Sequence, residues 1–379
     1  MKKIEFFRHN IEEEEIERVK SVLNSLFITT GDQNTEFEKN LAEYLDLPFT
    51  ATVTSCTGAM HLSLLAAGIG PGDEVITTPF TFVGTANSIL MAGATPVLAD
   101  IDRSTANIDP DAIEDAITPR TRAVIPVHLY GQMCDMEAIS DIAGRHGLTV
   151  IEDAAHCLEG EWKGSKPGHY GDYACFSFYA TKNITSGEGG AISVKDSGKH
   201  SLIRKLRLHG FSTDASERYT SKFKQYDVDI LGWKYNMDNI HAAILIEQLK
   251  KTGRLFRRRK KLYRLYSQGL SRIDGVELHH IRDEAEHACH LITILVDPKI
   301  RDQALSRLQD RGIGVSINFH PLHLFTYYRE RFGYREGMFP ASEEIGSRTI
   351  SLPFYPKLKD EEAEYVIESV RDILERIQD

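Results

Sequence analysis

The sequence predicts an α/β protein, with a mostly parallel sheet of seven strands covered by helices on both faces and a smaller α+β domain after it. Over the first part of the chain, short apolar runs alternate with amphipathic stretches. These runs are continuously apolar, as in strands that are buried on both faces. After about residue 240 the alternation stops, and the 379 residues are enough for two domains. We expect these domains at residues 1–240 and 241–379.

The expected strands of the sheet are seven apolar runs, at residues 51–55, 74–77, 96–99, 123–127, 148–151, 174–178 and 191–194. The expected helices between them lie at residues 58–67, 85–92, 110–116 and 136–146. A long helical pattern then runs from residue 237 to about residue 270, and Gly253 could interrupt it. In the second domain, we expect strands at residues 290–296 and 315–319 and helices at residues 301–310 and 360–376.

Composition excludes several classes of protein. The net charge of −10 argues against nucleic-acid binding, which needs a basic surface, and the basic run at residues 254–261 is interpreted as a solvated helix face. The five cysteines form no CxxC pair, which favours reduced thiols over disulfides or a metal site. No segment approaches the roughly 18 apolar residues of a membrane span, and the N-terminal residues do not resemble a signal peptide. We therefore expect a cytoplasmic protein with no metal.

The predicted strands end in polar and aromatic side chains. In an open α/β sheet, ligands bind outside the carboxyl ends of the strands. Six consecutive predicted strands are followed by such residues, at positions 55–58, 79–82, 100, 128–131, 152–156 and 177–182. The sequence therefore predicts an active site at this edge of the sheet.

Lys182 is the most informative residue at this edge. A lone loop lysine is usually solvated, but Lys182 follows the aromatic segment 176–179 and precedes a glycine-rich stretch at residues 187–190. Removing a lysine from water lowers its pKa and frees its amine for Schiff-base chemistry. Asp153 ends the neighbouring strand and could be a helix N-cap. It could also keep a pyridine nitrogen protonated, which is the acid that pyridoxal 5′-phosphate (PLP) needs beside its lysine.

Thr57, Gly58 and Phe82 fit the same cofactor. Thr57 and Gly58 could simply start a helix, but a helix N-terminus is also a binding site for a phosphate group. Phe82 could pack in the core or stack on a flat ring. One cofactor explains the phosphate site, the ring acid and the amine together, so the residues alone favour a PLP enzyme.

Several motifs together resemble the DegT/DnrJ/StrS family of nucleotide-sugar aminotransferases. They are GPGDEVI at residues 70–76, PVHLYG at 126–131, IEDAAH at 151–156, the Lys182 segment, LHG at 208–210 and SLPFYP at 351–356. The resemblance covers nearly the whole chain. It implies the aspartate-aminotransferase fold (PLP fold type I), with PLP as cofactor and pyridoxamine 5′-phosphate (PMP) as its aminated form.

The resemblance also implies roles for individual residues. Lys182 is expected to carry the Schiff base and Asp153 to pair with the pyridine nitrogen. The remaining expected cofactor contacts are His156 near the ring hydroxyl, Thr57, Gly58 and Ser177 at the phosphate, and Phe82 stacked on the ring.

Further contacts are expected from two other segments. In residues 232–237, either Lys234 or Asn236 is expected to reach the phosphate of a partner subunit, because many members have Asn at the position of Lys234. In residues 318–323, His323 and Asn318 are expected on the substrate side, although Asn318 stands where the family often has His. These roles imply a homodimer with shared active sites.

Within the family, the segments at residues 179–185, 233–236 and 327–332 are most similar to UDP-4-amino-4-deoxy-L-arabinose transaminase. The implied reaction moves an amino group from L-glutamate, leaving 2-oxoglutarate, to a nucleotide-linked keto-sugar, with a UDP-4-keto sugar favoured. Such sugars serve lipopolysaccharide, other surface polysaccharides or antibiotics. Two alternatives within the family are a sugar dehydratase, which replaces the lysine with His, and a non-catalytic regulator. A NAD-dependent enzyme would need a GxGxxG turn, which residues 54–59 lack.

Overall fold

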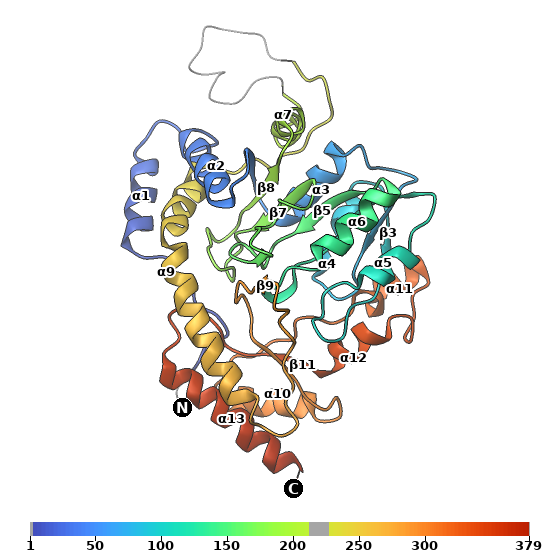
Figure 1. Cartoon of the computed structure of the whole chain (residues 1–379). Coiled ribbons are helices and arrows are strands. Elements are labelled where there is room, and N and C mark those ends of the chain that lie inside the picture. The colour runs from blue at the N-terminus through green and yellow to red at the C-terminus, as the bar shows by residue number, and fades with distance from the viewer. Residues whose placement is uncertain (1–2, 212–226, 379) are drawn as a thin grey trace.

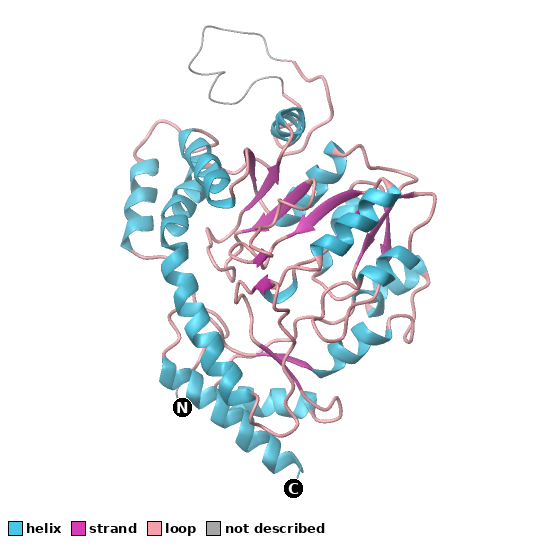
Figure 2. Ribbon diagram, viewed as in Figure 1, coloured by secondary structure: helices cyan, strands magenta, loops and turns pink. Residues whose placement is uncertain are grey.

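The computed structural model describes residues 3–211 and 227–378 (Figures 1 and 2). Its centre is a seven-stranded sheet in the order β1-β8-β7-β5-β4-β2-β3. The strands are β1 (Phe49–Val53), β2 (Glu74–Thr77), β3 (Thr95–Leu98), β4 (Thr121–Ile125), β5 (Thr149–Asp153), β7 (Tyr173–Ser177) and β8 (Gly190–Val194). Only β8 runs antiparallel to its neighbours, β1 and β7. The prediction of a mostly parallel seven-stranded sheet is confirmed.

Helices cover this sheet and are fixed at their starts by side-chain caps. They include α3 (Cys56–Ala66), α4 (Val83–Met91), α5 (Pro110–Asp115), α6 (Met136–His146) and α7 (Ser197–Leu206). Backbone N–H groups at the first turns of α3, α5, α6 and α7 donate to Ser55, Asp109, Asp135 and Asp196 respectively. α3 is buried on nearly every side because it packs against the sheet, α4 and α7. This burial holds the N-terminus of α3 rigidly at the edge of the sheet.

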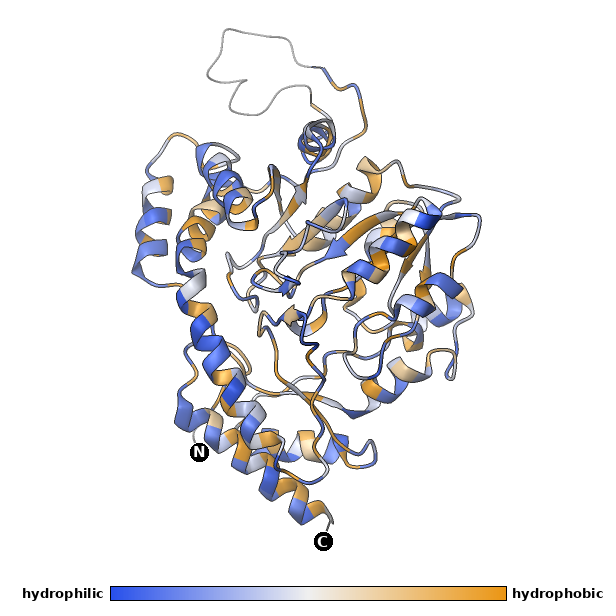
Figure 3. Cartoon of the chain, in the orientation of Figure 1, coloured by the Kyte–Doolittle hydropathy of each residue, from blue (hydrophilic) through white to orange (hydrophobic). Residues whose placement is uncertain are grey.

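The long helix α9 (Asn239–Leu270) is continuous, so Gly253 does not interrupt it. The first part of α9 packs against α1 (Glu13–Leu23) and α2 (Asp32–Leu45), and a later part packs against α13 (Asp360–Gln378) (Figure 1). Hydrophilic and hydrophobic stripes alternate along α9 and α13, as expected for helices with one buried face (Figure 3). No helix among the described residues has both the length and the apolar character needed to cross a membrane.

The C-terminal part has its own hydrophobic core. It contains a two-stranded sheet of β10 (Thr293–Leu295) and β11 (Thr349–Ser351) and the helices α10 (Arg301–Asp310), α11 (Thr326–Phe332) and α12 (Pro340–Arg348). Leu262 and Tyr266 of α9 belong to this core, and so does Ile4 from the N-terminal segment. The division of the chain at residue 240 stays a prediction, although the core shows that the first residues pack with the last ones.

The expected strand at residues 315–319 is wrong. Among the described residues, this segment makes a single isolated bridge, between Ser316 and Ser351, and then turns towards the edge of the large sheet. The apolar residues that suggested a strand are only partly buried. Asn318 and Phe319 face a cavity instead of a neighbouring strand.

Candidate active site

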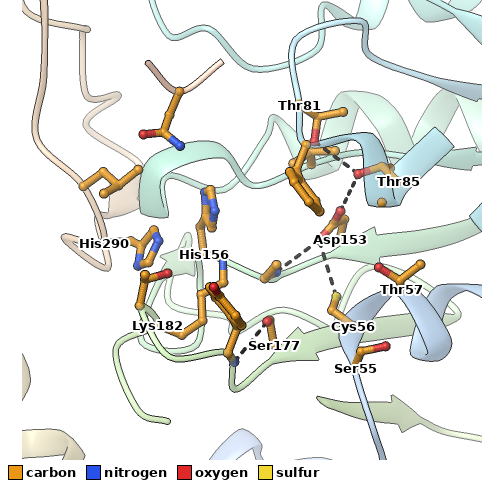
Figure 4. Close-up of a pocket in the computed structure, with 18 of the residues that line it drawn as sticks. Ser55, Cys56, Thr57, Thr81, Thr85, Asp153, His156, Ser177, Lys182 and His290 are labelled. Carbon is orange, nitrogen blue, oxygen red and sulfur yellow. Dashed lines mark hydrogen bonds between the residues drawn. The ribbon is translucent and has the colours of Figure 1, made fainter. Parts of the chain in front are cut away.

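A cavity of about 520 Å³ lies at the carboxyl ends of β1, β5 and β7 (Figure 4). This volume is typical of a small-molecule site. Seven of the sequence-predicted site residues line it: Thr57, Phe82, Asp153, His156, Ser177, Lys182 and Asn318. The C-terminal part closes it with His290 and Phe319. The edge predicted from the strand ends is therefore the edge at which the fold leaves a cavity.

Lys182 sits in the turn that follows β7. Its backbone N–H donates to Tyr179 O at 2.9 Å, and its side chain is only partly exposed, into the cavity. Burial lowers the pKa of Lys182 to about 8 from its usual 10.5, and the acidic groups of Cys56 and Asp153 offset part of that effect. The amine is thus prepared to react as a nucleophile near neutral pH, as its aromatic setting in the sequence predicted.

Asp153 is the last residue of β5, and its carboxylate is held from two sides. The hydroxyl of Thr85 donates to Oδ2 at 2.8 Å, and the backbone N–H of Ala155 donates to Oδ1 at 3.2 Å. The thiol of Cys56 lies 3.7 Å from Oδ1, and burial raises the pKa of that thiol well above its ordinary value. A fixed buried acid facing the cavity is what a protonated ring nitrogen requires.

Sequence reasoning missed Thr85 and Cys56. Thr85 lies one helical turn after Phe82 on the buried side of α4, where a hydroxyl needs a partner. A threonine on the buried face of this helix was the signal available in the sequence. Cys56 directly precedes Thr57 and gave no signal of its own.

The N-terminus of α3 forms the far end of the cavity. Gly58 N–H donates to the capping hydroxyl of Ser55 at 3.1 Å, so Gly58 is committed to the cap, and it does not line the cavity. Thr57 and Ser177 present their side chains there instead. A Cβ added to Gly84 would lie 2.7 Å from Thr57 Oγ1, so a larger residue there would crowd this hydroxyl. Hydroxyls at a helix N-terminus with open space in front of them suit a phosphate group.

Phe82 forms one wall of the cavity. Its side chain is 61% exposed, which is unusual for a large apolar residue at a concave surface. Its ring centroid lies 6.4 Å from that of Phe319, which continues the aromatic wall. An aromatic face left open beside an acid and an amine fits a flat heteroaromatic ring. The residues present therefore fit PLP along its whole length, from ring nitrogen to phosphate.

Besides Gly58, three of the predicted site residues lie outside this cavity: Lys234, Asn236 and His323. Lys234 is exposed, and its Nζ donates to Asn236 Oδ1 at 2.6 Å. His323 is fully buried, with Nε2 2.8 Å from Glu343 Oε1. The structure therefore does not bring His323 together with Lys182. Lys234 and Asn236 are bonded to each other, and Asn236 Nδ2 also donates to Thr30 Oγ1.

The fold also adds residues that no local pattern indicated. Phe6 and Phe7 line the cavity because the backbone of Ile4 is bonded to Gly312 and Gly314 in the C-terminal part, at 2.8 Å in each case. His290 reaches the cavity from the segment before β10. The positions of Phe6 and Phe7 depend on contacts between segments about 300 residues apart, and that of His290 on contacts between segments about 100 residues apart. Spacing in the sequence does not predict such contacts.

The sequence profile of the DegT/DnrJ/EryC1/StrS aminotransferase family matches residues 9–371. The chain belongs to this family. It is 44% identical to the spore coat polysaccharide biosynthesis protein SpsC of Bacillus subtilis, over 96% of this chain and 95% of that protein. It is also 44% identical to the uncharacterized protein MJ1066 of Methanocaldococcus jannaschii, over 97% of each chain.

Solved structures of family members share its fold. The PLP form of the putative sugar aminotransferase Spr1654 from Streptococcus pneumoniae is 30% identical, with a TM-score of 0.93, covering 99% of this chain and 100% of that one. PseC from Helicobacter pylori, an aminotransferase involved in pseudoaminic acid biosynthesis, is 29% identical with a TM-score of 0.92, over 99% and 100% of the two chains. Spr1654 also has a PMP form. The family member described here is accordingly a PLP-dependent aminotransferase with a type I fold, with PMP as the aminated cofactor.

Proposed function

We propose that this aminotransferase moves the amino group of L-glutamate onto a keto-sugar linked to a nucleoside diphosphate, with a UDP-4-keto sugar as the favoured acceptor. The observation that carries the proposal is the placement of the Lys182 amine in a cavity whose opposite side holds the carboxylate of Asp153. The proposal assigns catalysis to these two residues, and cofactor binding to Thr57, Phe82, His156 and Ser177.

When bound, PLP supplies a carbonyl that takes up the amino group and a protonated ring that withdraws electrons from the reacting carbon. Asp153 holds the proton on that ring nitrogen. Thr85 and Ala155 fix the Asp153 carboxylate, so its orientation is set before the cofactor arrives. Phe82 and Phe319 keep water from the faces of the ring.

Lys182 has two tasks in this proposal. It would anchor the resting cofactor, and once released its amine would take up and return a proton at the reacting carbon of the substrate. A pKa of about 8 suits both tasks, because a base that titrates near working pH can take up and return a proton. A histidine at this position could not form the covalent link, so Lys182 favours amination over the dehydration catalysed by relatives that lack the lysine.

A nucleotide-linked sugar is favoured as acceptor by two kinds of observation. A second hollow of about 440 Å³ shares Asn318 and Phe319 with the cavity, and Arg301 and His320 also line it. That hollow offers positive charge and aromatic surface beyond the reacting centre. The related SpsC and PseC are named for the biosynthesis of a polysaccharide and of pseudoaminic acid. UDP as the nucleotide and position 4 of the sugar rest on the resemblance of the segments at residues 179–185, 233–236 and 327–332.

We further propose that the enzyme works as a homodimer with shared sites. Leu26 and Leu231 are 88% and 78% exposed. Their segments are tied together, since Asn236 Nδ2 donates to Thr30 Oγ1 at 2.6 Å and Asn239 N–H donates to Ile28 O at 3.2 Å. Exposed apolar side chains on one surface favour a protein interface. Lys234 lies beside them, where its charge would meet the phosphate bound by a second copy.

The test is a reaction of the PLP-loaded protein with L-glutamate, followed by a panel of UDP-, dTDP- and GDP-linked 3- and 4-keto sugars. Mass spectrometry should detect an amino-sugar, with the largest yield from a UDP-4-keto sugar. The Lys182→Ala protein is the control and should give none. Formation of PMP with glutamate but of no amino-sugar from any member of the panel would refute the nucleotide-sugar assignment. Failure to form PMP would refute glutamate as the donor.

A further inference from the structure

Two stacked imidazoles form the wall of the cavity on the side of Lys182. The ring centroids of His156 and His290 lie 4.2 Å apart, with 28° between the planes. Figure 4 shows both rings on the same side of the pocket as Lys182, away from Thr57. His156 comes from the loop after β5, and His290 comes from the C-terminal part of the chain. The proposed function uses only His156.

The hydrogen bonds of Asn183 fix which nitrogen of His290 carries the proton. Asn183 Nδ2 lies 3.0 Å from the carbonyl oxygen of Ala288 and 2.7 Å from Glu159 Oε2. A backbone carbonyl can only accept, so the nitrogen of the amide must face Ala288 and Oδ1 must face His290. Because Oδ1 can only accept, Nδ1 of His290 donates to it, over 3.0 Å. In the neutral ring, Nε2 of His290 therefore carries a lone pair.

Tyr130 fixes His156 in the opposite way. The backbone N–H of Tyr130 donates to Nδ1 of His156 at 3.3 Å, so in the neutral ring Nε2 of His156 carries the proton. The carbonyl of the same residue accepts from the backbone N–H of His290 at 3.0 Å. Tyr130 is a buried residue with φ 57°, in the left-handed region that a bulky side chain rarely adopts. Such a conformation persists only where surrounding contacts impose it.

Charged groups around the pair keep both rings neutral. Lys182 faces both of them, and Arg259 donates to the carbonyls of Cys289 and His290 at 3.1 and 3.2 Å. Burial and Lys182 lower the pKa of His156 well below the ordinary histidine value. Burial, the neighbouring imidazoles, Lys182 and Arg259 do the same for the pKa of His290. Glu159, the nearby acid, is held by Asn183, and His287 adds a further ring on the same segment.

We propose that His290 is a positioning residue that acts through His156: its ring, hydrogen-bonded to Asn183 and stacked on His156, holds that neutral imidazole in place with its Nε2–H facing the cavity. That Nε2–H would donate to the ring oxygen of the bound cofactor. This inference rests on the cofactor site of the proposed function and is independent of the sugar. Asn183, next to Lys182 in the chain, links this pair of rings to the loop that carries the reactive amine.

The tautomers can be observed directly in the cofactor-free protein. Histidine labelled with ¹⁵N gives different nitrogen shifts for the Nδ1–H tautomer, the Nε2–H tautomer and the cation, and the His156→Asn and His290→Gln proteins assign the two signals. We expect Nε2–H for His156 and Nδ1–H for His290, both at neutral pH. The opposite tautomer at either position, or an imidazolium at His156, would overturn the proposal. This readout does not depend on any amino donor or acceptor.

A variant series tests the effect of His290 on the cofactor. His290→Phe keeps a stacked ring without nitrogens, whereas His290→Gln can still donate to Asn183 and accept in the cavity. Without the hydrogen bond to Asn183 the stacked ring is no longer fixed, and the His156 donor loses its position, so the pH at which the yellow lysine-bound cofactor titrates should rise by about one unit in His290→Phe. His290→Gln should restore part of the shift. His200→Phe, at a histidine that stacks on Phe49 outside the cavity, is the matched control and should leave the titration unchanged.

A merely structural role for His290 predicts a different result. It would lower cofactor affinity or thermal stability in His290→Phe without moving the titration of the yellow band, and this outcome would refute the proposal. If His290→Phe does not retain PLP, the histidine spectrum of the unaltered protein decides the question by itself. Conversion to PMP by glutamate, measured in parallel, separates failure of this inference from failure of the proposed function.

Discussion

Replacing Lys182 by methionine should stabilise the cofactor-free protein at neutral pH. The buried amine has a pKa of about 8 in the folded protein and 10.5 as its ordinary value, a difference of about 2.5 units. At about 1.36 kcal/mol per unit, keeping this ammonium out of water costs roughly 3 kcal/mol when both states are protonated. Methionine has a similar length and no charge, so Lys182→Met should recover most of that free energy of unfolding at pH 7.

The sign of the effect sets its pH dependence. The folded pKa lies below the unfolded one, so the penalty is complete below about pH 8 and disappears as pH rises towards 10.5. Urea unfolding of the cofactor-free proteins at pH 7 and at pH 10 measures both limits. Lys39→Met, at a side chain that is 75% exposed, is the control and should change stability by less than about 0.5 kcal/mol. Equal stability of Lys182→Met and the unaltered protein at pH 7, or a difference that does not shrink by pH 10, would refute the assignment of a desolvated amine.

Three further substitutions test other parts of the site and its support. Thr85→Val removes a buried hydrogen bond to the Asp153 carboxylate. A bond to a charged group is worth about 1.5 kcal/mol, so we expect PMP formation from glutamate to be roughly tenfold slower. Unchanged rates in stopped-flow measurements would contradict this role of Thr85. Phe82→Ala removes the exposed aromatic side chain, whose stacking on the cofactor is worth about 1 kcal/mol, so PLP should bind roughly fivefold more weakly in a fluorescence titration. Undiminished affinity would mean that the cofactor ring does not stack on Phe82. His128 and Glu152 are both fully buried, with His128 Nε2 2.8 Å from Glu152 Oε2, so His128→Leu leaves the carboxylate without this partner and should lower the free energy of unfolding in urea by about 3 kcal/mol. A loss near zero would mean that the backbone N–H groups of Gly168 and Gly171 satisfy the carboxylate alone.

The sequence was a good guide wherever local pattern and chemistry coincide. The strand at residues 74–77 and the helix at residues 136–146 agree with β2 and α6 in both bounds, because apolar periodicity and turn residues mark their ends. The placement of Asp153 and Lys182 at one edge of the sheet followed from the rule that parallel strands end together. The strand expected at residues 315–319 was wrong, because a short apolar run can line a cavity as well as form a strand.

The sequence by itself determined the fold class and the cofactor, and it proposed Lys182 as the anchor, since these depend on residue types at the ends of buried strands. Only the tertiary structure decided which side chains complete the site. His323 looked suitable by position in the chain, yet it is buried against Glu343, whereas His290 faces Lys182 from a segment that carries no motif of its own. The physical reason is that an imidazole acquires its tautomer and charge from partners such as Asn183 and Tyr130. Folding alone brings those partners into contact.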